Sequence, residues 1–306
     1  MKVTNIHNLP QHLVDKIIAQ NTGDPYSGQM DGKEYFRVTE LIKPPLIRSL
    51  KQRHSDKNSD KIVLDASDFL NVTLGTAVHA ALEGEDSEDT LFETGVAMEF
   101  NVDGKQVWVV GTVDEYWPLL NEICDNKTGM VFLHKKPIDP TYEAQTNIYA
   151  YLLKMHDCVT NKLEQPLLPR IHIRYWYKDW MRSGPERDPD YPLCPIQHRS
   201  VMVWTKEQIE SYIFDRLRDH LENPFRPCTE QERDFGGKWS VVSINDLEGR
   251  SKKNADTREE AEAWLMTKPY EKRKELTVAF RGKDQLCKHY CFVRTVCKYA
   301  QEKGYV

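Results

Sequence analysis

Two apolar segments near the middle of the chain each end in charged residues, and this pattern constrains the fold most. The first segment leads into Asp114, and a short polar turn separates it from the second, which leads into Asp125-Asn126-Lys127. Alternate side chains of a strand share a face, so Asp125 and Lys127 project together while Asn126 points away. If the two segments pair as a hairpin, Asp114 lies beside Asp125 and Lys127.

Two carboxylates and an ammonium are costly to hold at one point of a sheet unless a divalent cation shares the site. A surface hairpin with a weak ion pair is the alternative. The flanking residues are strongly apolar, from Val107 to Val113 and again at Ile123 and Cys124, which favours a buried site. A metal ion with a lysine beside it is an arrangement that cleaves phosphodiester bonds.

Two further motifs are weak when each is taken alone. His79 and Glu83 are four residues apart on a predicted helix that contains Gly75, so they share one helix face. Gln145 and Tyr149 have the same spacing on a later predicted helix. Each pair fits a solvated face or the core as well as it fits a functional site.

In their order along the chain, these residues match a known pattern. The chain resembles the RecB-like branch of the PD-(D/E)XK nuclease superfamily, whose motifs are G-x-x-x-H-x-x-x-E, G-x-x-D, D-x-K-T and Q-x-x-x-Y. The matching residues, which span roughly a quarter of the chain, are Gly75, His79, Glu83, Gly111, Asp114, Asp125, Lys127, Thr128, Gln145 and Tyr149. The segment Arg37–Pro45 and the C-terminal cysteines resemble exonuclease-like proteins of tailed phages more loosely.

The resemblance implies a role for each residue of the centre. His79, Asp114 and Asp125, together with the main-chain carbonyl of Asn126, would bind Mg²⁺ or Mn²⁺. Oxygen ligands suit Mg²⁺, and an imidazole makes Mn²⁺ a good substitute. Lys127 would orient the attacking water or help to deprotonate it, and would stabilise charge on the phosphoryl oxygens. The implied reaction is hydrolysis of a DNA phosphodiester that leaves a 5′-phosphate.

The resemblance also implies roles around the metal. Glu83 would be an additional ligand or would support one, and Gln145 and Tyr149 would position the substrate or the backbone near the metal. The chain departs from the pattern at Asn126, where this branch often has an apolar residue. Because Asn126 is expected to face away from the metal, we expect the departure to change packing rather than activity.

Three cysteines near the C-terminus, Cys287, Cys291 and Cys297, have the spacing of metal ligands, and Cys228 could complete a set of four. Sets of four thiolates bind Zn²⁺ or an iron–sulfur cluster. Related RecB-like nucleases of the AddB and CRISPR-associated types carry a [4Fe–4S] cluster. Their fourth cysteine precedes the nuclease core, whereas the first cysteine here is Cys124. The spacing favours a metal site over ordinary buried thiols, and both a cluster and a zinc ion stay open.

The net charge of −5 provides no overall basic surface, so contacts with DNA must come from local patches. Lys135 and Lys136, just past the predicted active-site turn, are the candidates for binding DNA phosphates. Arg174 begins a second basic stretch, in which aromatic residues alternate and could stack on unpaired bases. The alternative, which we favour for this second stretch, is that its basic residues lie on solvated faces and its aromatic rings pack in the core.

These motifs fit an α/β fold: a restriction-endonuclease-like mixed central sheet flanked by helices, with a small C-terminal α+β unit that contains the cysteines. We expect an N-terminal arm with a basic helix over 1–62, a nuclease core over 63–227 and the C-terminal unit over 228–306. Core strands are predicted at 95–102, 107–116, 121–127, 170–177 and 200–204, with a hairpin turn at Asp103-Gly104, and core helices at 69–82, 140–155 and 206–221. The C-terminal unit is predicted to contain strands at 239–244 and 276–280 and a helix at 257–265.

Together, the motifs predict a metal-dependent DNA exonuclease of recombination, repair or phage genome processing. Such a role implies DNA as a partner, with a helicase, a single-strand annealing protein or a single-strand-binding protein. The chain has no apolar run of membrane-spanning length and begins without an apolar signal core, so we expect it in the cytoplasm, that of the host if a phage encodes it.

Two alternative functions stay open at this point. The first is a structure-specific endonuclease, and the second is a non-catalytic DNA-binding subunit of a recombination complex. The intact set of Asp114, Asp125 and Lys127 disfavours the second, because a chain that has lost catalysis is expected to have lost at least one of them.

Overall fold

A computed structural model of the chain describes residues 1–22, 29–30, 32–54, 61–161, 168–234 and 237–306. The chain divides into two compact units. The sheet unit comprises residues 3–48 and 65–224, and the cysteine unit comprises residues 1–2, 49–64 and 225–306. The predicted boundary after residue 227 lies close to the observed one after Pro224, whereas the predicted N-terminal segment 1–62 is shared between the two units.

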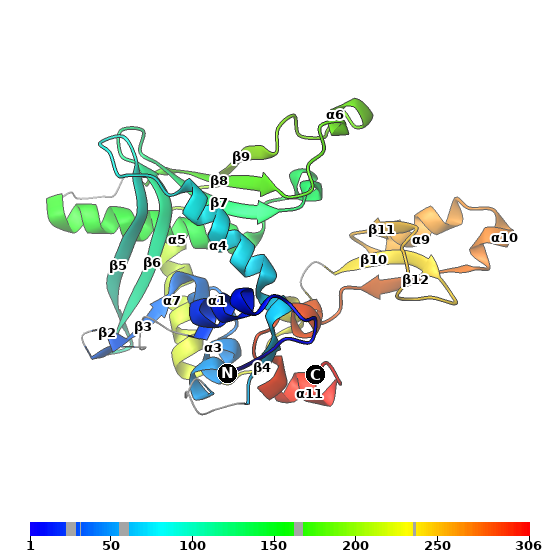
Figure 1. Ribbon diagram of the computed structural model, residues 1–306, viewed down its shortest axis with the longest axis horizontal. Coiled ribbons are helices and arrows are strands. Elements are labelled where there is room, and N and C mark those ends of the chain that lie inside the picture. Colours follow the sequence, from blue (N-terminus) through cyan, green and yellow to red (C-terminus); the bar gives the residue numbers. More distant parts are fainter. Residues whose placement is uncertain (23–28, 31, 55–60, 162–167, 235–236) are drawn as a thin grey trace. The chain divides into compact units, whose positions relative to one another are not determined.

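A mixed seven-stranded sheet forms the centre of the sheet unit (Figure 1). Its strands are β2 (Gln29–Met30), β3 (Lys33–Arg37), β5 (Leu91–Val102), β6 (Lys105–Trp117), β7 (Glu122–Gly129), β8 (Arg170–Tyr177) and β9 (Ile196–Val201). The β3–β6 and β7–β8 pairs are parallel, and the other pairs are antiparallel. The predicted mixed central sheet is confirmed.

Strand β6 organises the sheet because it is long enough to pair with three strands. One side of β6 pairs with β5 over nearly its whole length. On the other side, the first half pairs with β3 and the last residues pair with β7. Asp103 and Gly104 join β5 to β6 with φ angles of 52° and 88°, the left-handed conformations that a tight hairpin turn requires. The predicted hairpin is therefore present.

Helices flank the sheet and complete its core (Figure 1). Helix α4 (Leu70–Leu82) contacts β7, α5 (Pro140–Asn161) contacts β5, β6 and β8, and α7 (Lys206–Glu222) contacts α5 and β5. A capping box starts α7: Thr205 Oγ1 accepts the N–H of Gln208, whose side chain accepts the N–H of Thr205. Buried residues between the helices and the sheet include Phe36, Val109, Ile148, Leu152, Ile173 and Ile213.

Shorter elements connect these parts. They are α1 (Gln11–Thr22), α2 (Val38–Leu41), α3 (Pro45–Arg53), η1 (Ala66–Phe69), η2 (Val131–Lys135) and α6 (Gly184–Arg187). Strands β1 (Lys2–Thr4) and β4 (Val63–Asp65) form a separate two-stranded sheet. Within the ranges that the structure describes, no helix has both the length and the apolar character needed to cross a membrane.

Strand β9 differs from its predicted position. The sequence predicts a strand at 200–204, but β9 spans Ile196–Val201 and the chain leaves the sheet at Met202. Asn147 on α5 explains this exit, because its Nδ2 donates to the carbonyl of Met202 at 3.0 Å and its Oδ1 accepts the N–H of Trp204 at 2.8 Å. These backbone groups are thereby satisfied outside the sheet. The prediction was wrong for residues 202–204.

The cysteine unit contains a small α+β arrangement, as the sequence predicts. Its antiparallel sheet has the order β11 (Lys253–Ala255), β10 (Lys238–Ser243), β12 (Leu276–Arg281), and α9 (Arg258–Met266) packs against it (Figure 1). Val241, Ala255 and Ala261 form a small core, with Trp239 and Trp264 packed around it. The other elements are α8 (Glu230–Arg233), α10 (Tyr270–Arg273), η3 (Leu286–Tyr290), η4 (Arg294–Val296) and α11 (Lys298–Glu302).

The two ends of this sheet-and-helix module, residues 238–281, lie next to each other. Asp284 follows the module and is fully buried. Its carboxylate accepts hydrogen bonds from Arg233 Nε at 2.9 Å and from the hydroxyls of Tyr299 and Tyr305 at 2.9 and 2.8 Å. Its N–H donates to Asp234 Oδ1 at 2.8 Å. Residues 238–281 are therefore an inserted module whose two ends are joined at its base.

Candidate metal centre

Three acidic residues form a row across β5, β6 and β7. The β6–β7 register, continued by one residue, places Asp114 opposite Asp125. The β5–β6 register holds on both sides of Glu93 and places Glu93 opposite Asp114. Glu93 itself has a left-handed φ of 44°, which is uncommon for a residue other than glycine. The register thereby places three acidic residues at neighbouring positions on adjacent strands.

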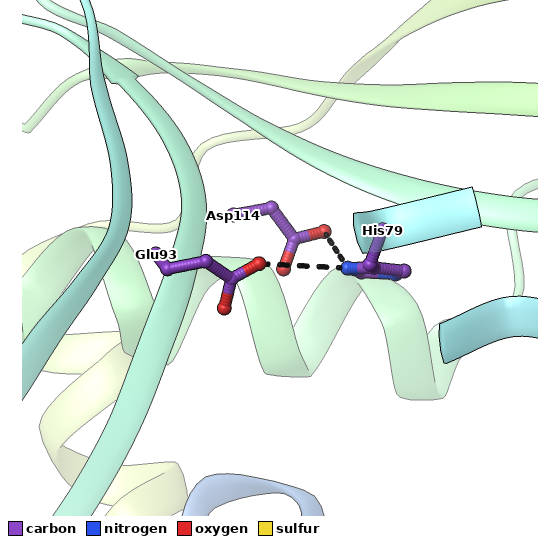
Figure 2. Close-up of side chains that lie close together, drawn as sticks. All are labelled: His79, Glu93 and Asp114. Atoms are coloured by element: carbon purple, nitrogen blue, oxygen red, sulfur yellow. Dashed lines mark ion pairs between the residues drawn. The ribbon is translucent and has the colours of Figure 1, made fainter. Parts of the chain in front are cut away.

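His79 on α4 forms a group of metal-binding type with two of these carboxylates (Figure 2). Its Nδ1 lies 3.6 Å from Asp114 Oδ2 and 3.7 Å from Glu93 Oε1. One ligand atom from each of the three residues lies within 4.8 Å of the others, and in the described part of the chain this is the one such group of His, Cys, Asp or Glu residues. An imidazole with carboxylates suits Mn²⁺ and Mg²⁺.

The backbone of Asn126 connects Asp114 to His79. Its N–H donates to Asp114 Oδ2 at 2.6 Å, and its carbonyl oxygen lies 3.1 Å from His79 Nε2. A proton on Nε2, donated to this carbonyl, leaves the lone pair of Nδ1 directed toward Asp114 and Glu93. This is the tautomer that a metal-binding histidine needs, with its other nitrogen held by a hydrogen bond.

Asp125 and Lys127 share one face of β7, as predicted. Lys127 Nζ lies 2.5 Å from Asp125 Oδ2. Gln145 on α5 donates from Nε2 to Asp125 Oδ1 at 3.3 Å and to the Tyr149 hydroxyl at 3.2 Å. The Lys127 ammonium also lies 5.1 Å from the centre of the Tyr142 ring. His79 of the first helix motif, Gln145 and Tyr149 of the second, and the hairpin residues thus lie close together.

Burial and repulsion perturb the charges of this centre. Burial, and then the Asp125 carboxylate, raise the pKa of Asp114 to about 7, although His79 and Lys127 oppose the shift. Burial alone would lower the pKa of Lys127, but Asp125 and then Asp114 outweigh it and raise that pKa above its usual value. Lys127 is therefore protonated at neutral pH, and Asp114 would be stabilised as an anion by a nearby cation.

The residues present fit a divalent cation. Asp125 is 3 % exposed, and its Oδ2 is ion-paired with Lys127 at 2.5 Å. Burial and the Asp125 carboxylate raise the pKa of Asp114, so two carboxylates face one ammonium here, and a bound cation would offset their repulsion. With Asp114, Glu93 and His79 alongside, the donor set is one that Mg²⁺ and Mn²⁺ accept.

Two predicted acids, Asp125 and Glu83, lie outside the ligand group, and an unpredicted one lies inside it. Glu83 is exposed just beyond α4, where the backbone turns to φ −60° and ψ 120°, so it leaves the helical face that carries His79. Glu93, which the sequence analysis does not single out, belongs to the group instead. The predicted hairpin turn is the signal that could have found it, because counting back from that turn places Glu93 opposite Asp114.

Gly111 of the G-x-x-D motif allows α5 to approach the sheet. A Cβ atom at this position would lie 2.4 Å from Cε1 of Tyr149 and 3.2 Å from Cγ2 of Val38. The missing side chain therefore leaves space for the Tyr149 ring, whose hydroxyl accepts a bond from Gln145. Glycine here serves close packing beside the metal centre rather than a special backbone angle.

The four predicted C-terminal ligands are free thiols that gather in the cysteine unit. Cys287, Cys291 and Cys297 are buried and Cys228 is half-buried. Burial, followed by the charges of Glu232 and the other three cysteines, raises the pKa of the Cys228 thiol to about 12. The thiols are close enough to interact electrostatically, but within the described residues no three of their sulfur atoms lie within 4.8 Å of one another. A metal at this set stays a prediction.

The two lysines predicted to bind DNA lie at the surface after β7. Lys135 closes η2 and is half exposed, with its Nζ 2.7 Å from Asp188 Oδ2 and 3.4 Å from Asp190 Oδ2. Lys136 is exposed. Two carboxylates neutralise the charge of Lys135 locally, so Lys136 is the better placed of the two to contact a phosphate.

Comparisons with known proteins find similar solved structures but no matching family or curated sequence. No protein family matches the chain, and no curated protein sequence matches it. Five chains of solved structures match, among them the crystal structure of SSO0001, with a TM-score of 0.49 and 16 % sequence identity over 74 % of this chain and 91 % of SSO0001. Identity and TM-score at this level carry no argument about the function of this chain.

Proposed function

We propose that this protein is a metal-dependent deoxyribonuclease that hydrolyses phosphodiester bonds in DNA as an exonuclease, in recombination, repair or phage genome processing. The observation that carries the proposal is the meeting of the His79, Glu93 and Asp114 group with the Asp125–Lys127 pair at one point of the sheet. Carboxylates and an imidazole suit a divalent cation, and a lysine beside it completes a phosphodiester-cleaving arrangement. The resemblance to the RecB-like branch supports DNA as the substrate.

Side chains from three strands and one helix would hold the metal. They are the group of His79, Glu93 and Asp114, with Asp125 opposite Asp114 and the carbonyl of Asn126 as the further ligands that the resemblance implies. A bound Mg²⁺ or Mn²⁺ supplies Lewis-acid activation of the phosphate and a more acidic water.

Lys127 would act on the charge that develops during hydrolysis. Asp125 holds its ammonium at the site, 2.5 Å away, and the raised pKa keeps it protonated at neutral pH. A protonated lysine donates to the attacking water, which orients it, and stabilises negative charge on the phosphoryl oxygens. Lys127 is therefore better suited to charge stabilisation than to accepting the proton of the water.

Gln145 and Tyr149 would act through Asp125. Gln145 donates to one carboxylate oxygen of Asp125 and to the Tyr149 hydroxyl, which fixes the plane of the carboxylate. Positioning of this kind keeps the other oxygen of Asp125 available to Lys127 and to a cation.

For the cysteine unit, we propose a structural [4Fe–4S] cluster or Zn²⁺ held by Cys228, Cys287, Cys291 and Cys297. Three buried thiols and a half-buried one in a small unit support this proposal, since structural metal sites stabilise units whose hydrophobic core is small. A DNA-processing role would place the protein in the cytoplasm, with a helicase, an annealing protein or a single-strand-binding protein as partner.

A digestion assay tests the proposed activity. Linear and circular DNA, single- and double-stranded, would be incubated with Mg²⁺, Mn²⁺ or EDTA and with native protein, Lys127→Ala or Lys206→Ala. Lys206 is the matched control, because it lies on α7 and pairs with Glu210 at 2.8 Å. We expect native protein and the control to degrade linear but not circular DNA when metal is present, and Lys127→Ala to degrade neither.

Two other results would change the conclusion. Cutting of circular DNA would identify an endonuclease. If folded protein cuts no substrate in the presence of metal, the nuclease proposal fails, and retained DNA binding in a mobility-shift assay would identify a non-catalytic DNA-binding subunit.

A further inference from the structure

A row of polar side chains crosses the sheet on the face opposite to Asp125 and Lys127. In the strand register, Arg174 on β8 lies between Asn126 on β7 and His198 on β9. Arg174 donates to Asn126 Oδ1 at 3.2 Å and to His198 Nε2 at 3.1 Å. Both of its terminal nitrogens also bond to Glu115 on β6, Nη2 at 3.0 Å from Oε2.

Glu115, Asn126 and Arg174 have little contact with water, whereas His198 at the end of the row is exposed. Glu115 and Asn126 are 4 % and 3 % exposed, and the Arg174 side chain is 14 % exposed. Arg174 is therefore largely buried, and is neither the surface contact for DNA nor the solvated residue that the sequence leaves open. A buried ion pair is weak evidence for stability, since apolar residues of similar volume often serve a fold equally well. Its position behind the metal centre suggests a second role.

Asn126 joins this row to the metal centre. Its Nδ2 donates to Glu115 Oε1 at 3.0 Å while its Oδ1 accepts from Arg174, so both ends of the amide are held. Its backbone N–H donates to Asp114 and its carbonyl lies against His79. Asn126 is thereby held through its side chain on one face of the sheet, while its backbone groups contact two of the proposed ligands.

We propose that Arg174 and Glu115 are positioning residues of the metal centre: they clamp the Asn126 amide and thereby fix the backbone groups that orient Asp114 and His79. The inference rests on the proposed function. It explains an amide at a position where the RecB-like branch often has an apolar residue. An apolar side chain would fill this space but would accept no hydrogen bond that sets its orientation.

Calorimetric titration of Mn²⁺ into the whole chain tests this role with two variants that break the clamp. Asn126→Leu removes the amide and keeps the backbone carbonyl. The double variant Glu115→Gln with Arg174→Met removes both charges together, so that no lone buried charge hinders folding. Arg48→Met is the matched control, because Arg48 is 7 % exposed and pairs with Glu34 Oε1 at 2.9 Å elsewhere in the sheet unit.

We expect Mn²⁺ to bind about 10- to 100-fold more weakly to both clamp variants and with native affinity to Arg48→Met. The titrations would be run at a temperature at which unfolding curves show each variant to be folded. Native Mn²⁺ affinity in both clamp variants would overturn the positioning role and leave the proposed nuclease intact. A native chain that binds no Mn²⁺ would overturn both.

Discussion

We expect Asp114→Asn to stabilise the metal-free protein while it abolishes metal binding. The Asp114 side chain is 11 % exposed, and burial followed by the Asp125 carboxylate raises its pKa from 3.8 to about 7. Above that pH the carboxylate is ionised against both effects. An asparagine has nearly the same shape, can still accept the N–H of Asn126, and carries no charge.

The rise in the pKa of Asp114 sets how much the substitution can raise the free energy of unfolding. A rise from 3.8 to about 7 corresponds to at most about 4 kcal/mol, at about 1.4 kcal/mol for each pKa unit. Part of this energy is repulsion that can also be relieved at Asp125, and burial of the asparagine amide has a cost of its own. We therefore expect Asp114→Asn to raise the free energy of unfolding by about 2 kcal/mol at pH 8. The folded protein keeps the Asp114 proton to a higher pH than the unfolded chain does. Native stability therefore falls as pH rises from about 4 to about 7, and the advantage of the variant shrinks as pH falls toward 4.

Urea unfolding in EDTA at pH 8 and pH 5 measures this difference. Glu83→Gln is the matched control, because it makes the same acid-to-amide change at an exposed residue just beyond α4, and we expect it to change stability little. Added Mn²⁺ should raise the unfolding midpoint of the native protein and leave that of Asp114→Asn unchanged. A variant less stable than the native protein at pH 8, or a difference that does not depend on pH, would refute the reasoning.

Three further predictions concern other parts of the chain. Burial lowers the pKa of His220 from 6.5 to about 4, so the free energy of unfolding should fall by about 3 kcal/mol as pH drops from about 6.5 to about 4. In urea unfolding, His220→Gln should remove most of this dependence on pH. An unchanged dependence would contradict the assignment to His220. Gly111→Ala should lower the free energy of unfolding by about 1–3 kcal/mol, because the added methyl group overpacks the Tyr149 ring. In thermal unfolding, the same substitution should cost clearly less when it is made in a Tyr149→Ala variant. Equal losses in the two backgrounds would exclude the Tyr149 contact as the cause. Cys287→Ser should lower the iron or zinc content of the purified protein, measured by mass spectrometry. Cys194→Ser, at an exposed cysteine, should leave the metal content unchanged. Equal metal content in the two variants would rule out the proposed cysteine site.

Features with strong local signals were predictable from the sequence. The Asp103-Gly104 dipeptide fixes the β5–β6 hairpin, because both residues adopt the left-handed conformation that a tight turn requires. Strand alternation then separates Asp125 and Lys127 from Asn126, and the hydrogen bonds on the two faces of β7 agree with it. The helix spacing of Gln145 and Tyr149 likewise corresponds to a direct hydrogen bond.

The acids of the site were harder to predict, because their positions depend on where elements end. The predicted strand begins at residue 95, but β5 begins at Leu91 and includes Glu93, whose positive φ is not a strand signal. Glu83 keeps the helical spacing from His79 in the sequence, yet α4 ends at Leu82. Gly84, two residues after Leu82, is a sequence signal of this helix end, since glycine commonly follows the last helical turn.

The clamp behind the metal centre was not predictable from local patterns. Arg174 lies in a stretch of alternating basic and aromatic residues that suits DNA as well as the core. Its actual partners, Glu115 and Asn126, lie 59 and 48 residues earlier in the chain, and pairing over such separations follows from the strand order of the whole sheet.

Asp284 makes the inserted module exchangeable. Because this carboxylate is bonded to Arg233 and its N–H to Asp234, the chain departs and returns at almost the same point, and the intervening 238–281 segment has its own small core. The entropy of closing such a loop grows only slowly with its length, so a shorter, longer or unrelated domain can replace the module without moving its two attachment points. Asp284 thereby fixes the point at which the 238–281 segment leaves and rejoins the chain, with Cys228 before that point and Cys287 after it.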